Sequence, residues 1–230
     1  MKALRLKIFQ EYASYRVPYS FENIETYPLP PYSTVLGLVH NAIGATRTIE
    51  GLRVSVQGTY GGIIRNYVRF KKYKSKGVED YPIMVSELQD VELLIHVHAD
   101  DEEILKQMVR GFQAPPRFLY MGRPEDLIFV EEVNMVDLHA HEPEDSYVLE
   151  QDAYIPLMWI EENGERLEGI LYRLEEYYRI MEGLNSGRRK RVKNTIRVFN
   201  RIPVMYVQKG AQVYSPLTVD ADGNPVWLSR

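Results

Sequence analysis

The segment ETYPLPPYSTVLGLVHNAIG, residues 25–44, constrains the fold more than any other stretch of the chain. It holds three prolines within four positions, and proline fixes φ at about −65° and disfavours helix at the residue before it. The apolar run that follows has the spacing of a short helix, which Ser33 or Thr34 can cap and Gly44 can end. We therefore expect a stiff, extended approach that holds the start of a buried helix in a fixed position.

The rest of the first 140 residues alternates between strand and helix patterns. ALRLKIF alternates apolar and polar residues, which predicts a half-buried strand, and DDEEILKQMVRG predicts a helix with acidic residues in its first turn. Further strands are predicted at residues 52–57, 63–72, 90–99 and 127–136. The order strand, helix, strands, helix, strand is that of a ferredoxin-like (split βαβ) arrangement. We predict an α+β fold with such a domain over residues 1–140.

The C-terminal part has more strand patterns than helix patterns. After a polar connection, AYIPLMWI, a turn at Asn163–Gly164 and RIPVMYVQKGAQVYSP predict a β-rich part over residues 147–230. Residues 169–184 fit helical spacing, but they are rich in tyrosine and also fit an extended chain. Their secondary structure stays open.

The basic residues are gathered into two stretches. Residues 51–78 contain seven Lys and Arg and no Asp or Glu, and residues 183–219 contain eight and again no acid, although the whole chain has a net charge of −4. Because salt screens charges beyond about 10 Å, local charge decides what binds locally. Two basic stretches on an acidic body indicate sites for a polyanion. The simpler alternative is a pair of solvated loops.

The first basic stretch, IIRNYVRFKKYKSKG, interleaves cations with aromatic residues. As a strand it places Arg65, Tyr67, Arg69 and Lys71 on one face, followed by Lys72. Cations meet phosphates, and tyrosine can stack on an unpaired base. We therefore predict RNA contacts from these five residues, whereas aromatic residues at this spacing could also belong to a core.

The second basic stretch, GRRKRVKNTIRVFNR, has four consecutive cations that cannot all be buried, so we expect a loop or hairpin tip. A solvated loop is the simpler interpretation. The functional interpretation is neutralisation of an RNA or DNA backbone. The residues predicted to take part are Arg188, Arg189, Lys190, Arg191 and Lys193.

Two histidine pairs have a spacing known from metal ligands, His96 with His98 and His139 with His141. No carboxylate is placed as an obvious third ligand, and the chain has no cysteine for a thiolate site or a disulfide. We therefore expect no metal and no cofactor, with a histidine-rich metal protein as an alternative from another class.

Catalytic motifs are also missing from the sequence, which contains no GxSxG, HExxH or P-loop pattern. A metal-independent ribonuclease needs only a general base and a cation. His40, Tyr60 and Lys106 could be combined in that way, but no spacing requires it. No residue is predicted to be catalytic.

The sequence gives no sign of a membrane protein. No apolar run approaches the roughly 18 residues of a membrane span, and the N-terminus lacks the apolar core of a signal peptide. We expect a cytoplasmic protein.

Two segments resemble the signature regions of the CRISPR-associated Cas-five family: SFENIETYPLPPYSTVLGLVHNAIG at residues 20–44 and FLYMGRPEDL at residues 118–127. The resemblance implies a repeat-associated (RAMP) subunit of a type I Cascade, of the I-B kind, with an RRM-like fold. It also implies a basic thumb insertion at about residues 52–84. The implied partners are the 5′ handle of the guide RNA (crRNA), the Cascade backbone subunit and large subunit, and target DNA in the assembled complex.

The resemblance also implies site residues. A handle phosphate would lie at the helix N-terminus formed by Ser33 and Thr34, and Gly122 would let the backbone approach RNA beside Arg123. The commoner family form reads Gly-Arg-Ser where this chain has Gly122–Arg123–Pro124. A rigid loop that completes the core and a plain turn are the simpler alternatives.

For function, the resemblance implies a non-catalytic subunit that grips the 5′ handle and caps the complex next to the large subunit. The alternative is a metal-independent endoribonuclease that processes precursor crRNA, because the type I-C branch of the family cuts RNA with Tyr, Lys and His. That branch has an adjacent Lys-His pair, and this sequence contains none. The non-catalytic role is therefore the preferred hypothesis.

Overall fold

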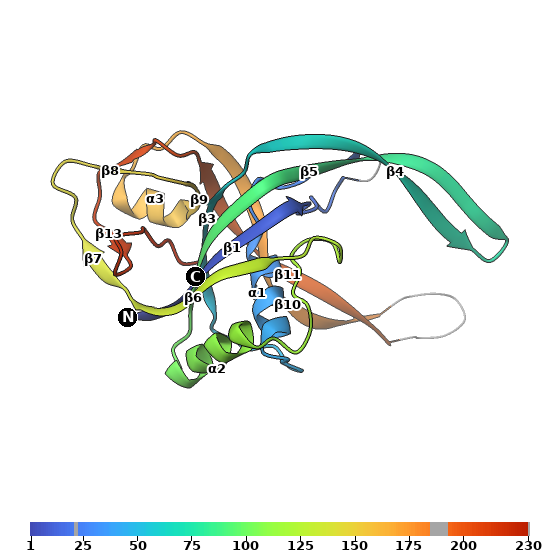
Figure 1. Ribbon diagram of the computed structural model, residues 1–230, viewed down its shortest axis with the longest axis horizontal. Coiled ribbons are helices and arrows are strands. Elements are labelled where there is room, and N and C mark those ends of the chain that lie inside the picture. Colours follow the sequence, from blue (N-terminus) through green and yellow to red (C-terminus); the bar gives the residue numbers. More distant parts are fainter. Residues whose placement is uncertain (21–22, 185–192, 230) are drawn as a thin grey trace.

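The computed structural model describes residues 1–20, 23–184 and 193–229 (Figure 1). The fold is mixed α/β and consists mostly of strands. From the N-terminus the elements are β1 (Lys2–Ala13), β2 (Asn23–Ile24), α1 (Tyr32–Ala42), β3 (Arg53–Thr59), β4 (Gly62–Lys74), β5 (Gly77–His98), α2 (Glu102–Gln113), β6 (Phe129–Asp137), β7 (His139–His141), β8 (Tyr147–Val148), β9 (Asp152–Pro156), α3 (Leu157–Asn163), β10 (Ile170–Leu184), β11 (Lys193–Val207), β12 (Gln212–Val213) and β13 (Leu217–Val219).

One large sheet organises the molecule, with the strand order β10-β11-β9-β3-β5-β1-β6 and antiparallel pairing between neighbours. β2 and β4 also pair with β5, outside this path. The strands that alternate with α1 and α2 along the chain therefore lie in the order β3-β5-β1-β6. The C-terminal strands β9, β11 and β10 extend the same sheet beyond β3. All of β10 lies within residues 169–184, whose secondary structure the sequence left open.

Helices α1 and α2 cover one face of this sheet (Figure 1). Leu4, Leu6 and Ile8 alternate along β1 and are buried against the apolar sides of both helices, which include Val35 and Met108. This packing follows from the spacing of the apolar residues, because every second residue of a strand and every third or fourth residue of a helix lies on one face. The main core therefore lies between the helices and the first strands.

The C-terminal segment covers part of the opposite face. Arg5 of β1 and His96 of β5 both bond the buried carboxylate of Asp220, each at 3.0 Å. Trp227 packs in a second apolar cluster with residues of β9, α3 and β11, and Ser229 donates its N–H to the carbonyl of Val54 at 2.7 Å. No helix among the described residues is both long and apolar enough to cross a bilayer.

Helix α1 begins earlier than predicted. Its first residue is Tyr32, and Pro31 is at the N-cap without a side-chain capping bond, so the capping role predicted for Ser33 or Thr34 is wrong. The first turn therefore includes Tyr32, whose side chain is fully buried, with its ring centroid 6.3 Å from that of Tyr154. The predicted end is confirmed, because Gly44 follows the last turn with φ of +64°.

Two hairpins project from the same side of the body in Figure 1, the β4–β5 hairpin above and the β10–β11 hairpin below. β5 is 22 residues long, so the strand predicted at residues 90–99 is only its inner half. β3 lies inside the large sheet. The projecting part of the range 52–84 therefore begins after β3, near residue 62.

Candidate nucleic-acid interface

The β4–β5 hairpin presents the first basic stretch. Arg65, Tyr67, Arg69 and Lys71 alternate along β4 and share one face, as the register with β5 requires. The Tyr67 side chain is 78% exposed. On the other face Phe70 lies 5.6 Å from Tyr81 across the hairpin, as measured between ring centroids. Cations and exposed aromatic rings are thus brought together on a surface that has no core beneath it.

Part of the positive charge on this hairpin is neutralised by its own second strand. The Asp80 carboxylate of β5 forms an ion pair with Arg69 at 2.7 Å, and the Glu79 carboxylate forms one with Lys74. These acids lie just beyond the acid-free stretch in sequence, but the antiparallel register places them opposite its cations.

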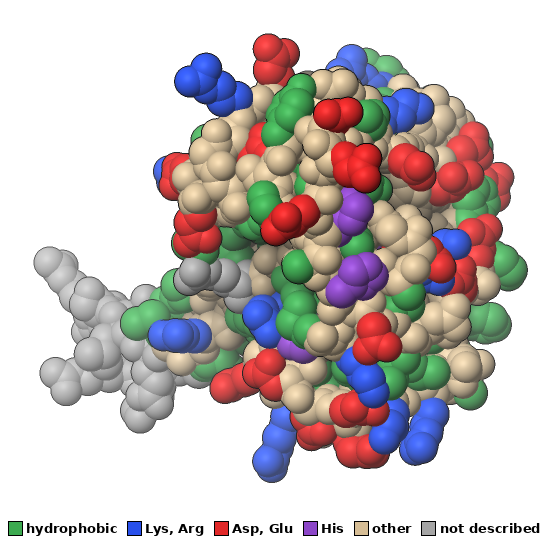
Figure 2. All heavy atoms as spheres, turned by 90° about the vertical axis from the view of Figure 1, so that its left-hand side faces the viewer, with side chains coloured by type: hydrophobic (Ala, Val, Ile, Leu, Met, Phe, Trp, Pro, Cys, Tyr) green, Lys and Arg blue, Asp and Glu red, His purple; other side chains and the backbone are tan. Residues whose placement is uncertain are grey.

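The other cations of the hairpin are exposed. Arg65, Lys71 and Lys72 make no ion pair within 4 Å to any described residue. The end of the molecule opposite the hairpins carries many acidic side chains (Figure 2). The cationic projection therefore lies away from an end that carries many acidic side chains, with Lys and Arg among them.

The described part of the second basic stretch begins at Lys193 and lies in β11. Arg188, Arg189, Lys190 and Arg191 lie outside the described residues, and of Lys193 only the backbone position at the start of β11 is described. The exposed cations of β11 that the structure describes are Arg197 and Arg201.

Two hollows meet over the exposed face of α1, sharing Ser33, Thr34, Gly37 and His40. The β10-side hollow, of about 470 Å³, is closed by residues of β10, β11 and the loop 45–48. The loop-side hollow, of about 560 Å³, is closed by the loop 117–122. Ser33, Thr34 and Gly122, predicted from distant parts of the sequence, are therefore brought to one hollow.

The first turn of α1 offers fewer free donors than predicted. The Thr34 N–H donates to the carbonyl of Pro31 at 2.9 Å, whereas the Ser33 N–H bonds no acceptor among the described residues. Of the two predicted phosphate ligands, only Ser33 therefore has an unused backbone donor.

The loop that carries Gly122 is held by the buried carboxylate of Asp126. This carboxylate accepts the Ser14 N–H at 3.0 Å and the Arg123 N–H at 2.9 Å. The Arg123 guanidinium pairs with the same carboxylate at 2.7 Å and also with Glu87. An RNA contact by Arg123 stays a prediction, and it would compete with both ion pairs.

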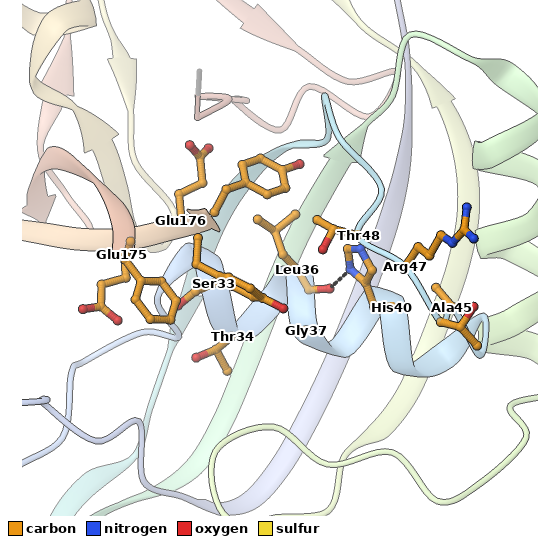
Figure 3. Close-up of a pocket in the computed structure, with 14 residues that line it drawn as sticks. Ser33, Thr34, Leu36, Gly37, His40, Ala45, Arg47, Thr48, Glu175 and Glu176 are labelled. Atoms are coloured by element: carbon orange, nitrogen blue, oxygen red, sulfur yellow. Dashed lines mark hydrogen bonds between the residues drawn. The ribbon is translucent and has the colours of Figure 1, made fainter. Parts of the chain in front are cut away.

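His40 has a structural explanation that does not involve catalysis. Its Nε2 accepts the Ile49 N–H at 2.8 Å, so Nδ1 carries the proton and donates to the carbonyl of Leu36 at 2.6 Å (Figure 3). Both ring nitrogens are occupied, and the imidazole ties the loop 45–49 to α1. This geometry leaves no nitrogen free to act as a general base.

The other two ribonuclease candidates lie elsewhere. Tyr60 lines a separate hollow with Asp152 and Lys209, and Lys106 of α2 pairs with Glu103 at 2.7 Å. The structure therefore does not assemble the three residues into one site.

The histidine pairs do not form a metal site either. His96 is fully buried against Asp220, while His98 bonds the carbonyl of Lys2 at 2.6 Å and Asp100 at 3.3 Å. His139 and His141 are exposed on β7. Among the described residues no group of three or more His, Asp or Glu side chains is placed to hold a metal.

Sequence reasoning missed several residues that line these hollows. Arg117 and Tyr120 border the loop-side hollow, and Tyr178 and Phe199 border the β10-side hollow. The motif FLYMGRPEDL contains Tyr120, but nothing local distinguishes it from its neighbours. Tyr178 and Phe199 meet only through strand pairing, so no short pattern could have indicated them.

Comparisons with known proteins agree with the resemblance noted in the sequence. The family model described as CRISPR-associated protein (Cas_Cas5) matches residues 3–205. A chain of a solved CRISPR RNA-guided surveillance complex is 16% identical with a TM-score of 0.59, and the match covers 96% of this chain and 92% of that one. A CRISPR protein from Archaeoglobus fulgidus is 13% identical with a TM-score of 0.48, over 100% and 99% of the two chains.

No curated protein is similar enough to count as a match. The chain of the surveillance complex shows the fold that this chain shares. The family model spans most of the chain, which makes this protein a member of the CRISPR-associated protein (Cas_Cas5) family.

Proposed function

We propose that this protein is a non-catalytic, guide-RNA-binding subunit of a type I Cascade, of the I-B kind, which grips the 5′ handle of the crRNA. Membership of the family supports a place in a CRISPR effector complex. The similarity of its fold to that of a chain in a CRISPR RNA-guided surveillance complex agrees with this proposal. The proposed partners are the backbone subunit, the large subunit and target DNA, and the proposed compartment is the cytoplasm.

One observation carries the RNA-binding part of the proposal: the exposed Arg65, Lys71 and Lys72 on a projecting hairpin, with no acidic partner among the described residues. An exposed cation without a partner can meet a phosphate without first breaking an ion pair. Tyr67, on the face of Arg65 and Lys71, adds a surface on which an unpaired base can stack. The β4–β5 hairpin would serve as the thumb of the family.

The handle itself would enter the loop-side hollow. Ser33 offers an N–H in the first turn of α1, where the helix dipole favours an anion. Gly122 lines the same hollow from the loop 117–122, so its backbone would lie beside the RNA. The β3-β5-β1-β6 order, with α1 and α2 on one face, supports the ferredoxin-like domain that we propose for residues 1–140.

Charge-neutralising variants test the proposal. In Lys71→Gln/Lys72→Gln, RNA affinity should fall, and the slope of log K against log salt should flatten by about 0.7 for each lost phosphate contact. The matched control is Arg110→Gln/Arg166→Gln, which removes two exposed charges from other parts of the body. Equal slopes for both double variants and the wild type would exclude the hairpin as the RNA-binding surface.

The endoribonuclease alternative needs its own assay. Purified protein is incubated with end-labelled repeat RNA in the presence of a metal chelator, since the proposed reaction needs no metal. We expect bound, intact RNA. Cleavage at one defined position, abolished by Tyr60→Phe or Lys106→Ala, would overturn the non-catalytic assignment.

A further inference from the structure

An aromatic wall closes the β10-side hollow. Tyr178 of β10 and Phe199 of β11 are direct cross-strand partners, with ring centroids 5.6 Å apart and planes at 59°. The guanidinium carbon of Arg197 lies 4.7 Å from the centre of the Tyr178 ring. Three planar groups therefore lie together on the β10–β11 hairpin, with Arg197 over the Tyr178 ring and the two rings tilted against each other.

A β-bulge positions this wall. The register with β11 shifts between Glu175 and Tyr178, so that two residues of β10 lie opposite Asn200 alone. A bulge bends its strand and turns the side chains that follow it. Here the bend directs Tyr178 toward α1, where its ring and that of Phe199 line the hollow together with Ser33 and Gly37.

The hollow has different chemistry at its two ends. Glu175 and the buried Glu176 lie on the β10 side, and Arg47 lies toward the far end of α1 (Figure 3). Between them Gly37 leaves the floor open, because no atom lies within 4 Å of where its Cβ would be. Arg201 is 3.4 Å from the Glu175 carboxylate and offsets part of its charge.

We propose that this hollow binds one unpaired nucleotide of an RNA strand. The base stacks on Tyr178 and Phe199, and the sugar-phosphate backbone crosses Gly37 toward Arg47. A volume of about 470 Å³ lies within the usual range for ligand sites, roughly 300–1,000 Å³. The inference rests on the proposed function, because it assumes that the protein binds RNA.

The arrangement favours a base over a protein side chain. The guanidinium of Arg197 covers one face of the Tyr178 ring, and the ring faces that remain uncovered suit the flat face of a base. The hollow also adjoins the first turn of α1, where the handle phosphate is proposed to lie. One strand could therefore occupy both hollows as it crosses α1.

The test combines three tyrosine variants with a fluorescent base. Each handle position of a synthetic repeat RNA is replaced in turn by 2-aminopurine, whose emission falls when it stacks on an aromatic ring. We expect quenching at one position, lost in Tyr178→Ala and kept in Tyr178→Phe. Loss of one stacking contact should weaken RNA binding about 5- to 150-fold, whereas Tyr214→Ala, which removes another exposed tyrosine, should bind like the wild type.

The salt dependence separates a lost stacking contact from a collapsed hairpin. Stacking involves no phosphate, so Tyr178→Ala should keep the wild-type salt slope, whereas a misfolded hairpin would lose cations and flatten it. If the wild type binds RNA but Tyr178→Ala binds equally well with unchanged quenching, the inference fails and the proposed function stands. If the wild type does not bind RNA, the proposed function itself fails. If Tyr178→Ala releases a protein partner and leaves RNA affinity unchanged, the hollow is a protein contact and the inference is wrong.

Discussion

Replacing Gly122 with alanine tests whether backbone geometry holds the loop beside α1. Gly122 has φ of +106°, a conformation that side-chain-bearing residues rarely adopt. A Cβ at this position would lie 2.7 Å from Oδ2 of Asp126 and 2.9 Å from the carbonyl oxygen of Ser14. Asp126 is only 2% exposed and anchors the loop through its hydrogen bonds. The added methyl group would therefore displace the loop's main support.

The expected cost has two parts. Holding a non-glycine residue in a sparsely populated region costs about 1–3 kcal/mol, and overpacking a well-packed site costs about as much, typically 1–3 kcal/mol. The free energy of unfolding should fall by about 2–6 kcal/mol, since the two effects act together. For a chain of this size, the melting temperature should drop by at least about 4 °C.

Thermal unfolding followed by circular dichroism measures this change. Another glycine of the loop-side hollow supplies a matched control. Gly37 is inside α1, and a Cβ there meets no atom within 4 Å. Gly37→Ala should therefore raise the free energy of unfolding by about 0.5–1 kcal/mol, because glycine is a poor helix residue. A Gly122→Ala variant that melts within about 1 °C of the wild type would refute the reasoning, since one kcal/mol corresponds to at least 2 °C.

Two further predictions concern buried polar contacts. Burial alone would raise the pKa of Asp220, but hydrogen bonds from His96 and Arg5 hold it well below its usual range. The Asp220 carboxylate therefore adds to the free energy of unfolding above the unfolded pKa of about 4, and this contribution is lost as the pH falls below that value. Urea unfolding at pH 7 and pH 3 should show a larger loss of unfolding free energy for the wild type than for Asp220→Asn. His40→Ala should lower the free energy of unfolding by about 1–3 kcal/mol, because two backbone groups lose their partner, and unchanged urea unfolding would contradict the role assigned to His40.

Short sequence patterns predicted those helices and strands that are set by interactions between residues close together in the chain. Helix α2 begins where the sequence indicates, because the Asp101 carboxylate accepts the Glu103 N–H at 2.9 Å and caps it. The outer half of β5 was missed, because GVEDYP has no apolar alternation. Its extended form comes from pairing with β4, which lies earlier in the chain. The spacing of residues 169–184 suited either structure, and pairing with β11 made them a strand.

The candidate site was predictable only in part, for the same reason. Ser33 and Gly122 could be indicated by the motifs that contain them, but their common hollow depends on how α1 packs beside the loop 117–122. The Tyr178–Phe199 wall depends on a register shift. Arg123 pairs with Asp126, three positions away, but also with Glu87, a residue 36 positions away. Contacts between distant residues leave no short pattern in a sequence.

The charge argument shows where sequence and space differ most. A stretch of sequence without Asp or Glu forms a surface without them only if no other segment packs beside it. In a hairpin the second strand packs beside the first and can bring acids to it. The register places Asp80 opposite Lys71 and Glu79 opposite Lys72. Yet these two acids pair diagonally instead, with Arg69 and with Lys74. Because each acid is already paired with one cation, Lys71 and Lys72 keep their charge available to a phosphate, so the hairpin remains a candidate RNA-binding surface although its second strand carries acids.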